Sequence, residues 1–254
     1  KDNINKMFDA VNLPVNEITT EILRNYLADY KSNSKAGMVT IDNIRRTLSS
    51  FFTWLENEDY IVKSPVRRIH KVKTTRRVKE TFTDENLEKL RDTCSNVRDL
   101  AILELLISTD MRVGEITRLN ISDMNFQERS CIVLGKGNSE REVYFSAKSK
   151  MYIKKYLKMR TDNNEALFVS LIKPYNRLGI SGIENLIRNL GKEANINKVH
   201  PHKFRRMMAT MAIDKGMPIE QVQKLLGHIK IDTTMEYAMV NQNNVKLSHR
   251  KYIS

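Results

Sequence analysis

The N-terminal part of the chain carries apolar side chains at the spacing of amphipathic helices. From Ile18 to Tyr30 they recur with helical periodicity, and Thr20 with Glu21 suits a helix start. A longer pattern of the same kind runs from Val39 to Tyr60, with Trp54 beside its apolar face. The polar face opposite that stripe carries Asp42, Arg45 and Arg46. Helices with one apolar side pack together, so we predict a small helical bundle.

A second set of patterns begins after Thr83, which is a typical helix N-cap because Asp84 and Glu85 follow it. Helical spacing gives way to the shorter period of strands between Ile121 and Phe145, where the turn Gly135–Ser139 permits a tight reversal. The predicted helices cover 83–90, 100–107, 147–160, 183–194, 204–215, 219–226 and 233–240, and the predicted strands cover 121–126, 131–134 and 142–145. We therefore predict a mainly α fold with a small antiparallel β-sheet, in two domains.

A basic segment separates the two regions. Between Lys63 and Lys79 there are eight positive charges and no negative ones. These charges belong to Lys63, Arg67, Arg68, Lys71, Lys73, Arg76, Arg77 and Lys79. A run of like charges repels itself and extends, so it is either a solvated spacer or a strap that lies across DNA phosphates. We predict a helical DNA-binding domain over 1–66, a basic linker over 67–80, and a second domain with a C-terminal tail over 81–254.

Composition narrows the class of partner. The formal net charge is +13 over 254 residues, which favours a polyanion, either nucleic acid or an anionic membrane surface. The apolar stretches are too short to span a bilayer, and two cysteines cannot form a disulfide framework, which indicates a reducing, cytosolic setting. The chain begins with Lys1 rather than Met, and the helical segment from Asn3 to Val11 is short, so we expect a domain upstream.

Several polar residues lie within segments that are otherwise apolar or are bounded by Gly or Pro, and each has an ordinary structural interpretation. Arg112 stands at a helix junction, where a surface arginine is the simpler interpretation, and Glu115 can hold its guanidinium or pair with Arg118. His202 and Arg205 share a helical face just after Pro201, at a helix N-terminus that suits anions. Both can also be solvated.

Two more candidates lie near the C-terminus. His228 follows the helix stop at Gly227, where a capping role is the ordinary explanation, and Tyr237 lies on an amphipathic segment, where a tyrosine is usually half-buried. Lys136 occupies the tip of the predicted hairpin.

Taken together these residues can cleave a phosphodiester. Two arginines can clamp its nonbridging oxygens and stabilise a pentavalent transition state without a metal. Tyr237 becomes a nucleophile if a base such as His202 removes its proton, and Lys136 can give a proton to the leaving 5′ oxygen.

In order and spacing these residues resemble the tyrosine recombinases, or phage integrase family. Five segments match the family's motifs: Thr109–Glu115 (the first arginine box), Gly135–Gly137 (the hairpin lysine), His202–Arg206 (the histidine-x-x-arginine box), Leu225–His228 (the second histidine) and Thr233–Tyr237 (the nucleophile). The resemblance covers the chain from about Thr81 onward and, more loosely, the N-terminal helices as a core-binding domain. It implies that the catalytic set is Arg112, Lys136, His202, Arg205, His228 and Tyr237, with Glu115 in support.

The resemblance also implies a mechanism and partners. Tyr237 would form a 3′-phosphotyrosyl bond, and exchange through a Holliday junction would need neither ATP nor a metal. The protein would close as a C-shaped clamp on duplex DNA and act as a homo-tetramer on two DNA sites, with accessory DNA-bending proteins. The tail from Asn241 to Ser254 would be exchanged between protomers, unless it is a frayed terminus. We expect a nucleoid-associated protein of the bacterial cytoplasm that integrates and excises a mobile element.

One residue departs from the family pattern, and three other functions stay open. The first arginine box commonly carries Gly where this chain has Asp110, whose charge either pairs with Arg112 or points away.

The alternatives are a chromosome or plasmid dimer resolvase, a type IB topoisomerase-like enzyme and a DNA-binding regulator without catalysis. Tyr252 rivals Tyr237 by residue type only, because it lacks the surrounding motif. We expect an upstream domain of the kind that binds DNA arms.

Overall fold

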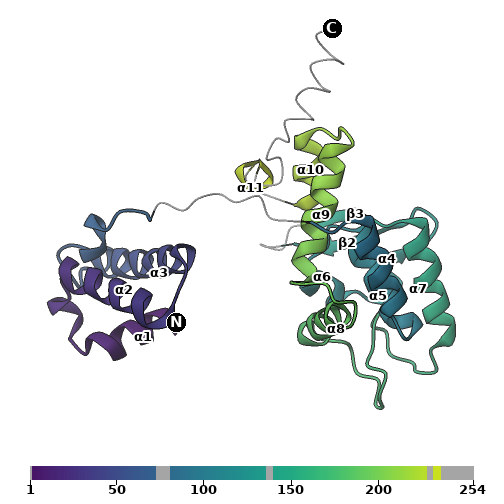
Figure 1. Cartoon of the computed structure of the whole chain (residues 1–254), viewed down its shortest axis with the longest axis horizontal. Helices are drawn as coiled ribbons and strands as arrows, with labels where there is room; N and C mark the ends of the chain where they lie inside the picture. Colours follow the sequence, from purple (N-terminus) through teal and green to yellow (C-terminus); the bar gives the residue numbers. More distant parts are fainter. Residues whose placement is uncertain (1, 73–80, 136–139, 228–230, 236–254) are drawn as a thin grey trace, which may run out of the picture. The chain divides into compact units, whose positions relative to one another are not determined.

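The computed structural model describes residues 2–72, 81–135, 140–227 and 231–235. The chain divides into two compact units, Lys1–Arg77 and Val78–Ser254, which are described separately below (Figure 1). Most of both units is helical, and one antiparallel sheet lies in the second. The predicted fold class is confirmed. None of the described helices is long and apolar enough to cross a lipid bilayer.

The N-terminal unit is a helical bundle. Its elements are α1 (Asp2–Val11), η1 (Val15–Glu17), α2 (Thr20–Ser34), α3 (Met38–Asn57) and η2 (Pro65–Arg68). The Thr19 hydroxyl caps α2 by accepting a hydrogen bond from the backbone N–H of Ile22. The apolar stripes predicted from the sequence meet in a core where Met7, Leu23, Leu48 and Phe52 are fully buried. Each such side chain contributes about 1.5–3 kcal/mol through burial.

Asp42 corrects the predicted polar face of α3. It is 3% exposed, whereas the pattern placed it on the solvent side. Its carboxylate pairs with Arg45 and Arg46 and accepts a hydrogen bond from the backbone N–H of Val72. The prediction failed because the segment after α3 folds back over this face, which periodicity within one helix does not reveal.

The described part of the basic segment packs on the bundle. Pro65 begins the short helix η2, whose Val66 is buried in the N-terminal core. The Thr20 hydroxyl donates to the carbonyl of Pro65 at 2.7 Å, and Arg24 donates to the carbonyl of Arg68 at 3.1 Å. Residues 63–72 are therefore ordered by contacts with the bundle instead of extending as like charges alone would dictate.

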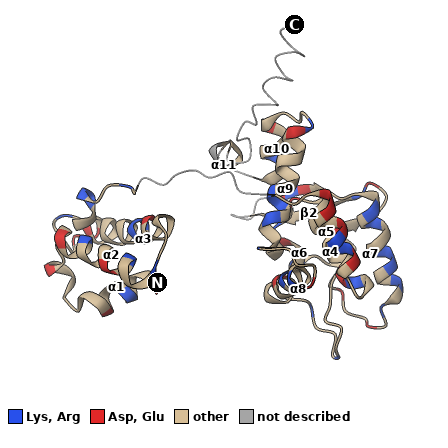
Figure 2. Cartoon of the chain, in the orientation of Figure 1, with Lys and Arg blue, Asp and Glu red and all other residues tan. Residues whose placement is uncertain are grey.

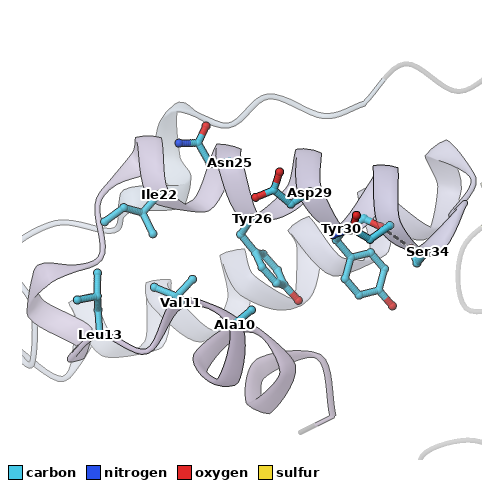
Figure 3. A pocket seen from close by; sticks show the side chains of 10 residues that line it. Ala10, Val11, Leu13, Ile22, Asn25, Tyr26, Asp29, Tyr30 and Ser34 are labelled. Atoms are coloured by element: carbon cyan, nitrogen blue, oxygen red, sulfur yellow. Dashed lines mark hydrogen bonds between the residues drawn. The ribbon is translucent and has the colours of Figure 1, made fainter.

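A groove of about 580 Å³ lies between α1 and α2 of the same unit (Figure 3). Apolar side chains line it from α1 (Val11), from the segment after α1 (Leu13) and from α2 (Ile22 and Tyr26). The Tyr26 hydroxyl is buried and has no hydrogen-bond partner among the described residues. None of the residues that line the groove is Lys, Arg or His, and the groove lies in a different unit from the predicted catalytic residues.

The second unit surrounds a larger core centred on α5. Its elements are α4 (Asp84–Thr93), α5 (Val97–Ser108), α6 (Val113–Arg118), η3 (Ile121–Asp123), β1 (Met124–Asn125), β2 (Ser130–Leu134), β3 (Glu140–Tyr144), α7 (Ala147–Met159), α8 (Ile180–Glu193), α9 (Pro201–Asp214), α10 (Ile219–Leu226) and α11 (Ile231–Met235). Helix α5 packs against α7 and α9. Its residues Ile102, Leu103 and Leu105 are completely buried.

The sheet has the order β1-β2-β3, and both pairs are antiparallel. Cys131 pairs with Val143, and Leu134 pairs with Glu140 next to the turn. The first predicted strand, 121–126, is wrong in extent. Residues Ile121–Asp123 form the helix η3, because the side chain of Asp123 caps the N–H of Asn120 and closes a tight turn.

The C-terminal helices carry two of the family motifs. Helix α9 is fixed by Phe204, which is fully buried and packs on Phe82 with ring centroids 4.6 Å apart. The ammonium of Lys203 lies 4.2 Å from the centre of the same Phe82 ring. Helix α10 ends at Gly227 in the left-handed conformation with φ of 60°, as the predicted helix stop requires. These contacts fix the rotation of α9 and so decide which of its polar residues face inward.

Candidate active site

Four of the predicted site residues of the second unit lie within the described residues: Arg112, Glu115, His202 and Arg205. Lys136, His228 and Tyr237 lie outside them. Helix α11, which packs on α10, ends at Met235, two residues before Tyr237. These four residues come from the N-terminus of α6 and from α9.

Arg112 is the N-cap of α6, and Glu115 fixes it there. One oxygen of the Glu115 carboxylate accepts from the Arg112 backbone N–H at 2.8 Å, and the other accepts from its guanidinium at 2.9 Å. Glu115 is buried, whereas the Arg112 side chain remains 41% exposed. Of the two partners predicted for Glu115, the structure selects Arg112 over Arg118. The guanidinium is thus held at one end and open to an anion at the other.

Arg205 projects from α9 into the interior and is 3% exposed. Its guanidinium donates short hydrogen bonds to the backbone carbonyls of Asp110 and Leu226. Burial and the nearby charge of Arg112 lower the pKa of Arg205. Two segments far apart in sequence, before α6 and at the end of α10, are therefore tied together by one side chain. The interpretation of Arg205 as a solvated surface residue is wrong.

His202 is placed differently, in the first turn of α9 on the exposed side. Its ring stacks on His200 with the centroids 6.5 Å apart and the planes 10° from parallel. Arg205 and His202 share α9, but one is buried and the other is open. A group that exchanges protons with a substrate needs such access.

Arg141 on β3 is a member of the site that the sequence analysis missed. Its Nη2 donates to Glu115 at 2.8 Å and lies 3.2 Å from a carboxylate oxygen of Asp110. Val143, two residues along β3, is fully buried. Because side chains alternate along a strand, Arg141 lies on the same inward side. That signal was available, but the predicted strand began one residue too late to include Arg141.

Asp110 pairs with arginines other than the one expected. Its carboxylate lies near Arg141 and, at 3.9 Å, near Nη1 of Arg205, while its ion pairs do not include Arg112. Three guanidinium groups and two carboxylates thus form one cluster, which we call the arginine cluster: Arg112, Arg141, Arg205, Asp110 and Glu115. It carries a net positive charge and presents Arg112 to solvent, an arrangement that suits a bound phosphate.

Seven of the eight predicted DNA-backbone residues of the basic segment belong to the N-terminal unit, and Lys79 falls in the second. The exposed ones within the described residues are Lys63, Arg67, Arg68 and Lys71, while Lys73, Arg76, Arg77 and Lys79 lie outside. Arg67 pairs with Glu56 at 3.5 Å. Both signs of charge are interspersed over the described helices (Figure 2). Among the described residues, no group of three or more His, Cys, Asp or Glu is arranged to hold a metal ion.

The second unit thus combines a mainly helical fold with a positively charged arginine cluster. The model of the phage integrase family matches residues 80–244. The chain therefore belongs to the phage integrase family, the tyrosine recombinases. The predicted family and the predicted enzyme class, a tyrosine-type site-specific DNA recombinase, are confirmed.

Relatives of known sequence extend over nearly the whole chain. The tyrosine recombinase XerC of Staphylococcus aureus (strain USA300 / TCH1516) is 29% identical over 253 residues, which cover 95% of this chain and 84% of the relative. XerC of Oceanobacillus iheyensis is 31% identical over 217 residues, covering 81% of this chain and 71% of that protein. The similarity thus includes the N-terminal unit as well as the second one.

Two solved structures show the same fold. The crystal structure of XerA recombinase is 26% identical with a TM-score of 0.61, covering 98% of this chain and 89% of its own. The Tn1549 transposon integrase in complex with a circular intermediate DNA is 16% identical with a TM-score of 0.78, covering 97% of this chain and 91% of that one. At that identity the second comparison supports the fold alone.

Proposed function

We propose that this protein cleaves and rejoins duplex DNA at specific sites through a 3′-phosphotyrosine intermediate and a Holliday junction. The observation that carries the proposal is the pair of arginines from the two family boxes. Arg205 is buried and anchored by two carbonyls, and Arg112 is fixed by Glu115 with its outer side open. Rigid, oriented guanidinium groups stabilise the charge that develops on a phosphorane better than flexible ones do.

The proposed cleavage step assigns a role to each residue. The Tyr237 hydroxyl attacks the scissile phosphorus, a new O–P bond forms, and the bond to the 5′ oxygen breaks. His202 accepts the tyrosine proton, Lys136 gives a proton to the leaving 5′ oxygen, and His228 hydrogen-bonds the phosphate. Arg112 and Arg205 bind the nonbridging oxygens. The phosphotyrosyl bond conserves the energy of the broken linkage, so a 5′ hydroxyl from a second duplex reverses the step.

The proposed partner is double-stranded DNA. The net charge of +13 and the basic residues of 63–79 supply the charge complementarity, and a structural neighbour is an integrase in complex with DNA. We further propose a tetramer on two DNA sites, assisted by DNA-bending proteins, with the tail after Val240 exchanged between protomers. Such an assembly belongs on the bacterial nucleoid, in the cytoplasm.

The proposed role is integration and excision of a mobile element, and resolution of chromosome or plasmid dimers is the second candidate. The second is favoured by the relatives, which are named XerC and reach 29% and 31% identity. Deleting the gene distinguishes the mobile-element role from dimer resolution. Loss of an excised circular element with normal chromosome segregation supports the first role. Accumulation of chromosome dimers with the element unaffected contradicts it and supports the second.

A nicked suicide duplex tests the chemistry. Its sequence is selected from a random duplex library by binding to the full chain, and the nick lets the cleaved strand diffuse away. The wild-type chain should form a covalent adduct, Tyr237→Phe should form none, and the matched control Tyr252→Phe should retain it. An adduct that survives Tyr237→Phe, or its absence in the wild type, would contradict the proposal.

A synthetic four-way junction separates the recombinase from two other functions. A recombinase resolves the junction into paired duplexes, whereas a topoisomerase-like enzyme relaxes supercoiled plasmid and leaves the junction intact. A regulator without catalysis binds the junction and cleaves nothing. Relaxation of a plasmid without any binding site, with no junction resolution, would contradict the recombinase function.

A further inference from the structure

The carboxylate of Asp110 is enclosed by the arginine cluster. Asp110 has no exposed surface, and one of its oxygens lies 3.2 Å from Nη2 of Arg141 and 3.9 Å from Nη1 of Arg205. Neither oxygen has a hydrogen-bond partner among the described residues. The carboxylate is therefore held mainly by the charges of Arg141 and Arg205, in a place where a buried polar group is normally hydrogen-bonded.

Titratable and charged groups face Asp110 from each element packed around it. They are Glu115 of α6, Cys131 of β2, Arg141 of β3 and Arg205 of α9. Arg112, the N-cap of α6, adds its charge next to Glu115 and Arg205. Burial is the largest influence and raises the pKa of Asp110 to about 6, although Arg141 and Arg205 oppose the rise. The burial of Cys131 raises the pKa of its thiol to about 12, so that residue stays neutral. Asp110 therefore changes charge closer to neutral pH than an ordinary aspartate does.

The anchor of Arg205 does not depend on the Asp110 side chain. Arg205 donates to the backbone carbonyls of residues 110 and 226, and any residue at position 110 supplies that carbonyl. Arg112 is likewise fixed by Glu115 and not by Asp110. Removing the carboxylate charge therefore changes the electrostatic field of the cluster while both phosphate-binding arginines keep their anchors.

We propose that Asp110 is an internal counter-ion. It is a positioning residue whose carboxylate offsets one positive charge of the arginine cluster in the free protein, and the scissile phosphate supplies that negative charge when DNA is bound. The inference rests on the proposed function of the cluster. With both acids ionised, three arginines leave one net positive charge, and protonation of Asp110 leaves two. The phosphate brings a like charge toward the carboxylate, so its entry favours uptake of one proton from solvent by Asp110.

The proposal predicts that the Asp110 carboxylate slows formation of the covalent adduct, and that this effect depends on pH. Above the pKa of Asp110 its charge repels the phosphate and the transition state, which gains negative charge. Near pH 5 the wild-type residue is protonated and resembles asparagine. Asp110→Asn should therefore form the covalent adduct about tenfold faster than wild type near pH 8 and at an equal rate near pH 5.

The test compares single-turnover adduct rates of the full chain on the nicked suicide duplex across this pH range. The ratio of the Asp110→Asn rate to the wild-type rate isolates Asp110, because the other titrating groups are common to both proteins. Asp99→Asn is the matched control: it removes another buried carboxylate, paired with Arg98 away from the cluster, and its ratio should not vary with pH. A ratio for Asp110→Asn that is flat with pH, or below one near pH 8, overturns the proposal.

A second measurement keeps the inference separate from the proposed function. If wild type forms no adduct at any pH, the proposed function fails, and anion binding by the cluster is measured directly with sulfate. Sulfate should raise the melting temperature of Asp110→Asn more than that of wild type near pH 8 and equally near pH 5, relative to chloride of matched ionic strength. Equal shifts at both pH values overturn the counter-ion role even then.

Discussion

At the scale of single residues, Arg205 is the side chain on which the site depends most. Its two carbonyl contacts bring the loop before α6 and the end of α10 to the same guanidinium. A side chain held in this way loses little entropy when it binds a substrate, so its hydrogen bonds contribute most when charge develops.

Arg205→Ala should therefore impair cleavage far more than DNA binding. We expect the adduct rate to fall about 10²–10³-fold, the usual effect of losing one transition-state donor. DNA affinity, measured by filter binding on the same duplex, should change by less than about tenfold. Circular dichroism should check that the variant folds, because Asp110 loses a neighbouring positive charge.

Arg188→Ala is the matched control for that variant, because Arg188 is an exposed arginine of α8 whose guanidinium donates to the side chain of Asn185. It should leave both the adduct rate and the affinity within about twofold of wild type. Equal losses of cleavage and binding in Arg205→Ala would contradict a role in the transition state.

The buried carboxylate of Asp110 also makes a prediction about stability. Burial raises its pKa to about 6 from the ordinary 3.8, so its ionised form is disfavoured in the fold. The resulting destabilisation is absent below about pH 4 and fully present once the pH exceeds the folded-state pKa. Asp110→Asn cannot ionise, so its free energy of unfolding relative to wild type should rise by about 2–3 kcal/mol from about pH 4 to pH 7.5.

Urea unfolding followed by circular dichroism measures this difference. Trp54 is the single tryptophan and lies in the N-terminal unit, so its fluorescence follows that unit and should be the same in both proteins. A stability difference that does not change with pH would show that Asp110 keeps its ordinary pKa in the fold.

The sequence predicted some of these residue contacts and missed others for a physical reason. The pairing of Glu115 with Arg112 is local, three residues apart on one helix, and helical spacing includes it among the options. The contacts of Asp110 with Arg141 and Arg205 join a loop, a strand and a helix. Such contacts depend on how elements pack, which a one-dimensional pattern does not contain.

At the scale of elements, the end of α10 positions one side of the site. Gly227 has φ of 60°, and a Cβ added there would lie 2.8 Å from Cδ and Nε of Arg141. The position therefore needs glycine both for its left-handed backbone and for the space next to Arg141. The helix stop and the arginine cluster are coupled through this close approach.

Gly227→Ala should destabilise the second unit by about 1–2 kcal/mol and displace Arg141. We expect a lower urea midpoint by circular dichroism and a slower adduct rate. Gly179→Ala is the control, because Gly179 caps α8 with φ of −83° and a Cβ there meets nothing within 4 Å. A Gly227→Ala variant as stable and as active as wild type would contradict the coupling.

Element boundaries followed from the sequence where one residue type dictates them. Gly227 ends α10 and Thr83 is the N-cap of α4, as predicted; the capping box that Thr83 forms with Asn86 was not predicted. The failure at Ile121–Asp123 has a local cause, since a three-residue turn capped by Asp123 has apolar spacing like that of a short strand. Asp42 was misplaced because the partner that buries it is a distant segment.

At the scale of the whole molecule, we expect charge to govern the affinity of the protein for DNA. The net charge of +13 includes eight positive charges between Lys63 and Lys79, a stretch that contains no acidic residue. The described part of that segment packs on the N-terminal bundle with Arg67 and Arg68 exposed. Replacing Arg67, Arg68, Arg76 and Arg77 with Gln should make the dependence of DNA affinity on salt less steep. The negative slope of log affinity against log salt should shrink in magnitude by about 0.9 for each DNA phosphate that these arginines neutralise in the wild type.

The measurement uses a short synthetic duplex and fluorescence anisotropy at several salt concentrations. The control replaces the same number of lysines on α7 with Gln: Lys150, Lys154, Lys155 and Lys158. It removes equal charge and should alter the slope less. Equal slopes for the wild type and the arginine variant would show that the basic segment is a spacer away from DNA.

The overall architecture was predictable because the two kinds of periodicity lie in separate parts of the chain. Helical spacing before Lys63, strand spacing between Ile121 and Phe145 and helical spacing thereafter predicted a mainly α protein with one small sheet. The family followed from the order of the motifs, which the match over residues 80–244 confirms. The arginine cluster required the structure, because its members come from three separate elements.

The most direct test of the proposed chemistry identifies the amino acid that is joined to DNA. The adduct trapped on the nicked duplex is digested with trypsin and nuclease, and the nucleotide-bearing peptide is sequenced by mass spectrometry. We predict a 3′-phosphate ester on Tyr237. A nucleotide on any other residue, or a linkage through a 5′ phosphate, would contradict cleavage by Tyr237.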